Sequence, residues 1–181
     1  EKKIALLTRI EGLKINPIIS EELNRVAKNL ENSGWIIEEP EAPNFQEAAN
    51  FQATLWLGEF RRTGGEAISK ENDPDSNFIY SQMSRRCPDT SLEKFMDSLQ
   101  QRARISREWN KFFDQYPIIL CPVTGDIPFP DLKDLESKES FDLVFDSMLP
   151  QIAPPYMGLP GLSFATSQTK QNIPLGVQFI S

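Results

Sequence analysis

Apolar residues in the first forty positions alternate between short continuous runs and one helical stripe. Residues 3–7 form an apolar run of strand length, and residues 35–37 begin a second one. The stripe between them has i, i+3, i+4, i+7 spacing and consists of Leu23, Val26, Ala27 and Leu30. Asn16-Pro17 offers an N-cap with proline in the first turn, and Gly34 permits a left-handed C-terminal cap. This order predicts a strand–helix–strand unit with parallel strands.

Two longer helical patterns follow. Residues 45–62 form the first, and because its aromatic residues spread around the helix we expect it to be largely buried. Residues 66–90 are polar and mixed, with a turn at 72–75. Residues 91–116 form the second helix, with an expected buried side of Leu92, Phe95, Met96, Leu99 and Ala103. Its arginines are expected on a solvated face, namely Arg102, Arg104 and Arg107.

The last third of the chain is divided by proline and glycine. Pro117 ends the long helix, and residues 118–121 are a buried strand followed by a proline-rich loop at 122–130. Loops at the carboxyl ends of such strands commonly build binding sites. A short amphipathic helix contains Phe141, Val144, Phe145 and Met148. Two apolar strands, 162–165 and 175–180, follow among turns, and the whole pattern predicts a single α/β domain over residues 1–181.

Composition and charge exclude several partners. The chain is 39% apolar and 25% charged with a net charge of −7, and no basic stripe is present, so we expect no nucleic acid partner. No apolar run approaches the roughly 20 residues that span a bilayer, so we expect no membrane insertion. Cys87 and Cys121 lie far apart without metal-type spacing, which favours a reducing, cytoplasmic location.

The residues themselves do not specify a reaction. The chain has no histidine, which excludes a Ser-His-Asp triad, a Cys-His pair and a histidine-ligated zinc site within it. Ser163, Thr166 and Ser167 are not in a Gly-x-Ser-x-Gly elbow, and the nearby Lys170 is expected to be solvated and protonated. The acidic residues at 131–139 are typical of a solvated loop. We therefore predict no metal and no catalytic residue.

The segment at 149–180 resembles the C-terminal signature of the amidase-signature family. The matching residues are Gly158, Leu159, Pro160, Pro174, Gly176, Val177 and Gln178. Earlier segments agree with that family's second half in order and spacing, including the sequence REWNKFFDQYPIILCPVTGDIPF. Ser167 departs from the pattern, because the family often has glycine there. The resemblance implies a mixed β-sheet covered by helices, as part of the amidase-signature fold.

The same resemblance implies hydrolysis of a carboxylic amide through an acyl-serine intermediate, without a cofactor. The family's catalytic lysine and two serines lie upstream of the matched region, so none is assigned here. We expect two segments to contribute to the wall of the amide pocket: the loop residues Thr124, Ile127 and Phe129, and Pro154, Tyr156 and Met157. The alternative is that these residues only pack against the other half of the enzyme.

The ends of the chain complete these expectations. It starts at Glu1 without methionine and stops at Ser181 directly after a strand, which predicts a fragment whose partner is the missing N-terminal catalytic half. Alone it should be inactive. Strands around 118–121, 162–165 and 175–180 should be exposed and favour self-association. A non-catalytic binding or scaffolding subunit related to amidotransferase A subunits, and a degenerate inactive homologue, remain the alternatives.

Overall fold

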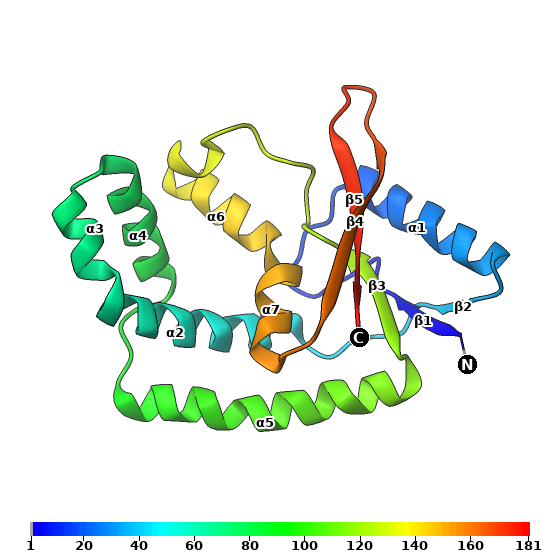
Figure 1. Ribbon diagram of the computed structural model, residues 1–181, viewed down its shortest axis with the longest axis horizontal. Coiled ribbons are helices and arrows are strands. Elements are labelled where there is room, and N and C mark those ends of the chain that lie inside the picture. Colours follow the sequence, from blue (N-terminus) through cyan, green and yellow to red (C-terminus); the bar gives the residue numbers. More distant parts are fainter. Residues whose placement is uncertain (1) are drawn as a thin grey trace.

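A five-stranded mixed sheet runs through the protein (Figure 1). The computed structural model describes residues 2–181; Glu1, where the chain starts, lies outside them. The strands are β1 (Lys3–Leu6), β2 (Ile36–Glu38), β3 (Ile118–Pro122), β4 (Gly161–Gln168) and β5 (Pro174–Ile180), in the order β2-β1-β3-β5-β4. β1 is parallel to β2 and β3, whereas β5 is antiparallel to β3 and β4. The predicted α/β class with a mixed sheet is therefore confirmed.

Helices cover both faces of this sheet. In residues 2–181 they are α1 (Pro17–Asn32), α2 (Phe45–Thr63), α3 (Gly65–Glu71), α4 (Pro74–Arg86), α5 (Leu92–Gln115), α6 (Lys138–Ser147) and α7 (Leu149–Met157), with a 3-10 turn at Lys133–Leu135. α1 lies on one side of the sheet, and α2, α5 and α7 lie on the other (Figure 1). α3 and α4 lie at the end of α2 that is away from the sheet, and α6 lies between α4 and the β4–β5 hairpin.

Side chains that alternate along the strands separate two cores. Ala5, Ile119 and Cys121 face the core shared with α2, α5 and α7, where Trp109 meets Phe45 edge to face at 4.6 Å between ring centroids. The neighbouring strand residues face α1 and its stripe, in a cluster of Ile4, Leu6, Ile19, Leu23, Val26, Ala27, Leu120 and Val177. This period-2 alternation explains why the central strands are continuous apolar runs.

The predicted β1–α1–β2 unit is confirmed, together with its end signals. Asn16 accepts a hydrogen bond from the Ile18 backbone N–H at 3.0 Å, and Pro17 occupies the first turn. At the other end Gly34 has a φ of 85°, a left-handed conformation that glycine adopts without steric cost. Local caps and one apolar stripe are therefore enough to define α1.

The segment at 66–90 contains two helices that the polar composition does not predict. The expected turn at 72–75 is the junction between them, because Asn72 ends α3 in a left-handed conformation with a φ of 56°. Asp73 then caps α4 by accepting from the Ser76 N–H at 2.7 Å, and Pro74 is its first residue. The residues at 72–75 that were read as a loop therefore end one helix and begin the next.

The predicted buried side of α5 is wrong. Leu92 is 76% exposed, and Met96, Leu99 and Ala103 are also exposed, with Phe95 half-buried. The side that packs on the sheet core carries Ser98, Ile105 and Trp109 instead. The predicted exposure of strands holds only for β4; the segments 118–121 and 175–180 lie in central strands and are mostly buried.

α7 occupies part of the segment that the proline and glycine pattern predicts to contain turns. Pro154 and Pro155 lie inside this helix and lack the N–H groups that would bond one turn back. The Pro150 carbonyl, which Pro154 cannot engage, accepts a hydrogen bond from Gln178 Nε2 on β5 at 3.0 Å. A tertiary hydrogen bond thus replaces a helical one, which is why proline content alone predicts the wrong structure here.

Candidate functional site

The loop after β3 is held in one shape by polar contacts. Asp126 Oδ1 accepts from Asn16 Nδ2 at 2.6 Å and from the Ile127 N–H at 2.8 Å. The Thr124 hydroxyl donates to the Asp126 carbonyl at 2.6 Å. Gly125 packs so closely on the preceding segment that a Cβ there would lie 2.5 Å from the Lys14 carbonyl oxygen. These contacts fix the conformation of the loop, so that its side chains form a defined surface.

This surface borders a cavity of about 510 Å³, which we call the β3-loop cavity. The predicted residues Thr124, Ile127 and Phe129 all line it. Val144 on α6 and Met148, the residue that follows α6, form one opposite wall, and the β4–β5 hairpin forms the other. The hairpin contributes mainly Ser163, Phe164, Ala165, Pro174, Leu175 and Gly176. A cavity of this size with largely apolar walls suits a small organic molecule.

The other three predicted residues lie elsewhere. Pro154 and Tyr156 are buried on α7, and Met157 is half-buried against the same core. The Tyr156 hydroxyl donates to the Ser98 carbonyl on α5, and its ring stacks on Phe51 with centroids 5.7 Å apart. The structure therefore separates the six residues into a cavity wall and an interior helix. Contact with a substrate stays a prediction for all of them.

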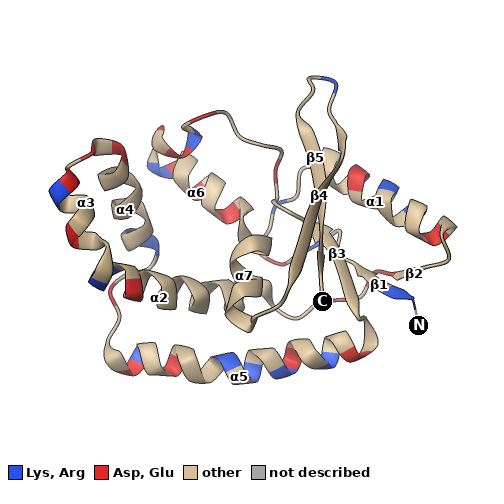
Figure 2. Cartoon of the chain, viewed as in Figure 1, with Lys and Arg blue, Asp and Glu red and all other residues tan. Residues whose placement is uncertain are grey.

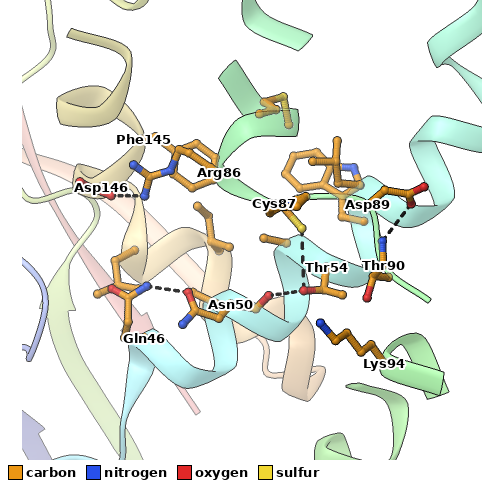
Figure 3. A pocket seen from close by; sticks show the side chains of 18 residues that line it. Gln46, Asn50, Thr54, Arg86, Cys87, Asp89, Thr90, Lys94, Phe145 and Asp146 are labelled. Atoms are coloured by element: carbon orange, nitrogen blue, oxygen red, sulfur yellow. Dashed lines mark hydrogen bonds and ion pairs between the residues drawn. The ribbon is translucent and has the colours of Figure 1, made fainter. Parts of the chain in front are cut away.

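A second cavity, which the sequence did not indicate, lies between α2, α4 and α6 and has a volume of about 460 Å³ (Figure 3). We call it the α2–α4 cavity. Gln46, Asn50 and Thr54 form a polar row along the α2 wall, and the Gln46 side chain donates to Asn50 Oδ1 at 3.0 Å. Cys87 lies opposite, with its thiol 3.8 Å from the Thr54 hydroxyl. The spacing of four residues between these polar side chains on α2 was the available signal.

Ion pairs fix the outer wall of the α2–α4 cavity, where charged residues of α4 and α6 meet (Figure 2). Arg86 donates to Asp146 and, at 2.8 Å, to Asp142, and its guanidinium lies 4.5 Å from the centroid of the Phe145 ring. The hydrogen bond from Arg86, aided by Arg85, lowers the pKa of Asp142 below its ordinary value. These contacts connect α4 to α6 and thereby hold the outer wall of the cavity in place.

Two of the three hydroxyls that were considered as nucleophiles, those of Ser163 and Thr166, make structural hydrogen bonds. The Ser163 hydroxyl donates to Gln178 Oε1 at 3.2 Å, and the Thr166 hydroxyl donates to Glu22. Lys170 is exposed at the tip of the β4–β5 hairpin. Within residues 2–181 no group of three or more cysteine or acidic side chains could hold a metal ion. None of the helices described is both long and apolar enough to cross a bilayer.

One curated protein and two solved structures are similar to almost the whole chain. An indoleacetamide hydrolase of Bradyrhizobium diazoefficiens is 27% identical over 181 residues, which is 99% of this chain and 34% of that protein. An amidase crystal structure superposes with a TM-score of 0.75 at 15% identity, over 100% of this chain and 42% of its own. A fatty acid amide hydrolase superposes with a TM-score of 0.74 at 15% identity, over 99% of this chain and 36% of its own.

The chain thus spans about a third of the length of the curated relatives it matches. The family model for amidases matches residues 1–181, that is, every position of the chain. Together with the ordered motifs from Gly158 to Gln178 and the mixed sheet, this match establishes the family. The chain belongs to the amidase family.

Proposed function

We propose that this chain is one part of an amidase that hydrolyses a carboxylic amide to an acid and ammonia or an amine. The observation that carries the proposal is that the amidase model matches residues 1–181 although the chain spans only about a third of related hydrolases. In this proposal the chain supplies sheet strands, covering helices and part of the substrate pocket. The acyl-transfer residues, a lysine and two serines, belong to the rest of the enzyme.

The β3-loop cavity is the part of the pocket that we assign to this chain. Ile127, Phe129 and Phe164 form apolar walls, while Thr124 and Asp126 place polar groups at one side. An amide with an aryl or alkyl body fits this distribution, because its body would be desolvated while its polar end stays hydrogen-bonded. Similarity to indoleacetamide hydrolases makes arylacetamides the first substrates to test.

The chain alone is proposed to be inactive. Its hydroxyl candidates are engaged by Gln178 and Glu22, and the chain has no histidine to act as general base. The assay is ammonia release from indoleacetamide by the purified 181-residue chain, with a blank lacking protein. We expect no release above the blank. Turnover that follows the chain through purification and is lost on Ser163→Ala would overturn this part of the proposal.

A chimera tests the contribution to the pocket. In it, this chain replaces the matching third of the Bradyrhizobium diazoefficiens indoleacetamide hydrolase, and the same enzyme lacking that third is the control. We expect amide hydrolysis by the chimera only, and a change of KM in Phe129→Ala that is absent from Leu132→Ala, an exposed neighbour outside the cavity. A folded but inactive chimera would instead favour the alternative role, that of a non-catalytic binding or scaffolding protein related to amidotransferases.

Partners and location follow from the same proposal. β4 is an edge strand with Leu162 63% exposed, and we propose that it pairs with the missing N-terminal catalytic half or, when the chain is isolated, with a second copy. Light scattering after gel filtration should then show a mass that falls on dilution; a constant monomer mass would contradict this. Two free thiols support a cytoplasmic location, and one sheet with strands from both ends supports a single domain.

A further inference from the structure

A cavity with a volume of about 990 Å³ lies between α2 and α5, and we call it the α2–α5 cavity. It shares no lining residue with the β3-loop cavity. Its apolar lining consists of Leu55, Trp56, Leu92, Phe95, Leu99 and Pro155. Trp56 is 53% exposed, and Leu92 and Leu99 on α5 are exposed as well. This apolar surface is therefore accessible from solvent.

Three arginines line the same cavity: Arg61, Arg62 and Arg102. Arg61 donates through Nη2 to the Cys87 carbonyl, but its buried Nη1 has no hydrogen-bond acceptor and lies 3.9 Å from the Asp89 carboxylate. Among residues 2–181, Arg62 and Arg102 have neither a hydrogen bond nor an ion pair through their guanidinium groups, whereas Arg104 on the same helix is paired with Glu47 and Glu108.

The acids at this cavity do not cancel these cations. Glu59 and Asp89 are the two carboxylates that line it, and the Asp89 side chain is 88% exposed. Three guanidinium groups against two carboxylates leave an excess of positive charge beside an apolar floor. An anion with an apolar body satisfies both features at once. A planar carboxylate also matches the fork of guanidinium donors, which bind it through two parallel hydrogen bonds.

We propose that the α2–α5 cavity binds an amphipathic carboxylate, an acid with an aryl or alkyl body. The body lies on Leu55, Trp56 and Phe95, and the carboxylate pairs with Arg62 and Arg102. The volume accommodates such a ligand, since pockets for small organic molecules measure roughly 300–1,000 Å³. This site is independent of amide hydrolysis, because none of its residues belongs to the proposed substrate wall.

The test is a titration of the 181-residue chain with octanoate below its micelle concentration. Calorimetry measures affinity, and the fluorescence of Trp56 reports occupancy, with Trp56→Phe assigning the signal. Octanol and octylamine are the neutral and cationic probes of equal length. We expect saturable binding of octanoate at one site, at least about tenfold tighter than either probe, because charge-assisted hydrogen bonds are roughly twice as strong as neutral ones.

Variants assign the binding to the cavity. Arg102→Gln should weaken octanoate binding about five- to tenfold and leave octanol unaffected, and Arg62→Gln should act in the same direction. Arg107→Gln is the matched control, since Arg107 is exposed on the same helix but does not line the cavity. Octanoate binding no tighter than octanol, or Arg102→Gln indistinguishable from Arg107→Gln, would overturn the proposal, as would the absence of saturable binding.

Discussion

Glu22 is the site at which a single substitution tests how the β4–β5 hairpin is held. This buried carboxylate on α1 accepts from Arg25 Nε at 2.9 Å and from the Thr166 hydroxyl on β4. Arg25 also donates to the Thr166 carbonyl at 3.1 Å. A β-bulge lies between Ala165 and Ser167, so that Thr166 is the extra residue at the point of contact with α1. Glu22→Gln keeps the size of the side chain but removes its charge.

The magnitude follows from the lowered pKa of Glu22. The Arg25 hydrogen bond outweighs burial and, with Thr166, lowers the pKa of Glu22 from 4.5 to about 2. At about 1.4 kcal/mol per pKa unit this difference corresponds to an upper bound of about 3.5 kcal/mol. Because the Arg25 side chain is 47% exposed, solvent screens the pair, and we expect about 1–2 kcal/mol. The folded-state pKa is depressed, so this stability is complete above pH 4.5 and is lost as the pH falls toward 2.

Urea unfolding followed by circular dichroism measures the effect. Glu22→Gln should lower the free energy of unfolding by about 1–2 kcal/mol at pH 7, and the difference from wild type should fall to less than about half by pH 3. Glu31→Gln, which removes an exposed pair with Lys28 on the same helix, should change stability by less than about 0.5 kcal/mol. An effect of Glu22→Gln equal to the control at pH 7, or unchanged at pH 3, would refute the reasoning.

Three further predictions concern buried polar groups. Gln178→Leu leaves the Pro150 carbonyl without its donor and should lower the free energy of unfolding by about 1–3 kcal/mol in urea melts. Gln100→Leu, at an exposed position of α5, is the control and should not cause this loss. Tyr156→Phe leaves a carbonyl of α5 unsatisfied and should cost a similar amount; no loss would show that water replaces the hydroxyl. Burial raises the pKa of the Cys121 thiol to about 12, so a thiol reagent at pH 8 should modify only Cys87 in the folded chain, and Cys87→Ser should abolish the reaction.

Local signals predict those parts of the fold whose partners lie nearby in sequence. The β1–α1–β2 unit combines a cap, an apolar stripe and two apolar runs, and each signal agrees with the others. α5 shows the limit of such signals. Its helical period was predicted, but two apolar sides compete, and Trp109 and Ile105 rather than Leu92 and Leu99 meet the sheet core. Periodicity defines a helix, whereas the aromatic contacts across α2 decide which side is buried.

Of the two cavities described as candidate sites, the sequence predicted only the one beside the loop that follows β3. The loop after β3 was expected to bear a site because it leaves the carboxyl end of a buried strand, and Thr124, Ile127 and Phe129 do line one cavity. The α2–α4 cavity depends on how α4 and α6 dock through Arg86 and Asp142. That contact joins residues 56 positions apart, and no local pattern reports it.

The free edge of β4 and the α2–α5 cavity are both exposed to solvent, but they differ in the chemical groups that they present. The sequence of β4, GLSFATSQ, has no charge and no proline, and the feature that limits pairing along its free edge is the β-bulge at Thr166. The α2–α5 cavity instead combines exposed apolar side chains with Arg62 and Arg102, whose guanidinium groups are hydrated when no ligand is bound. The free backbone groups of β4 can therefore pair with another strand, whereas the ligand proposed for the α2–α5 cavity is an anion. A single covering surface that is uniformly apolar would leave those arginines desolvated and unpaired, which is costly. A segment that pairs with both surfaces would bring a strand to β4 and an anionic group to Arg62 and Arg102.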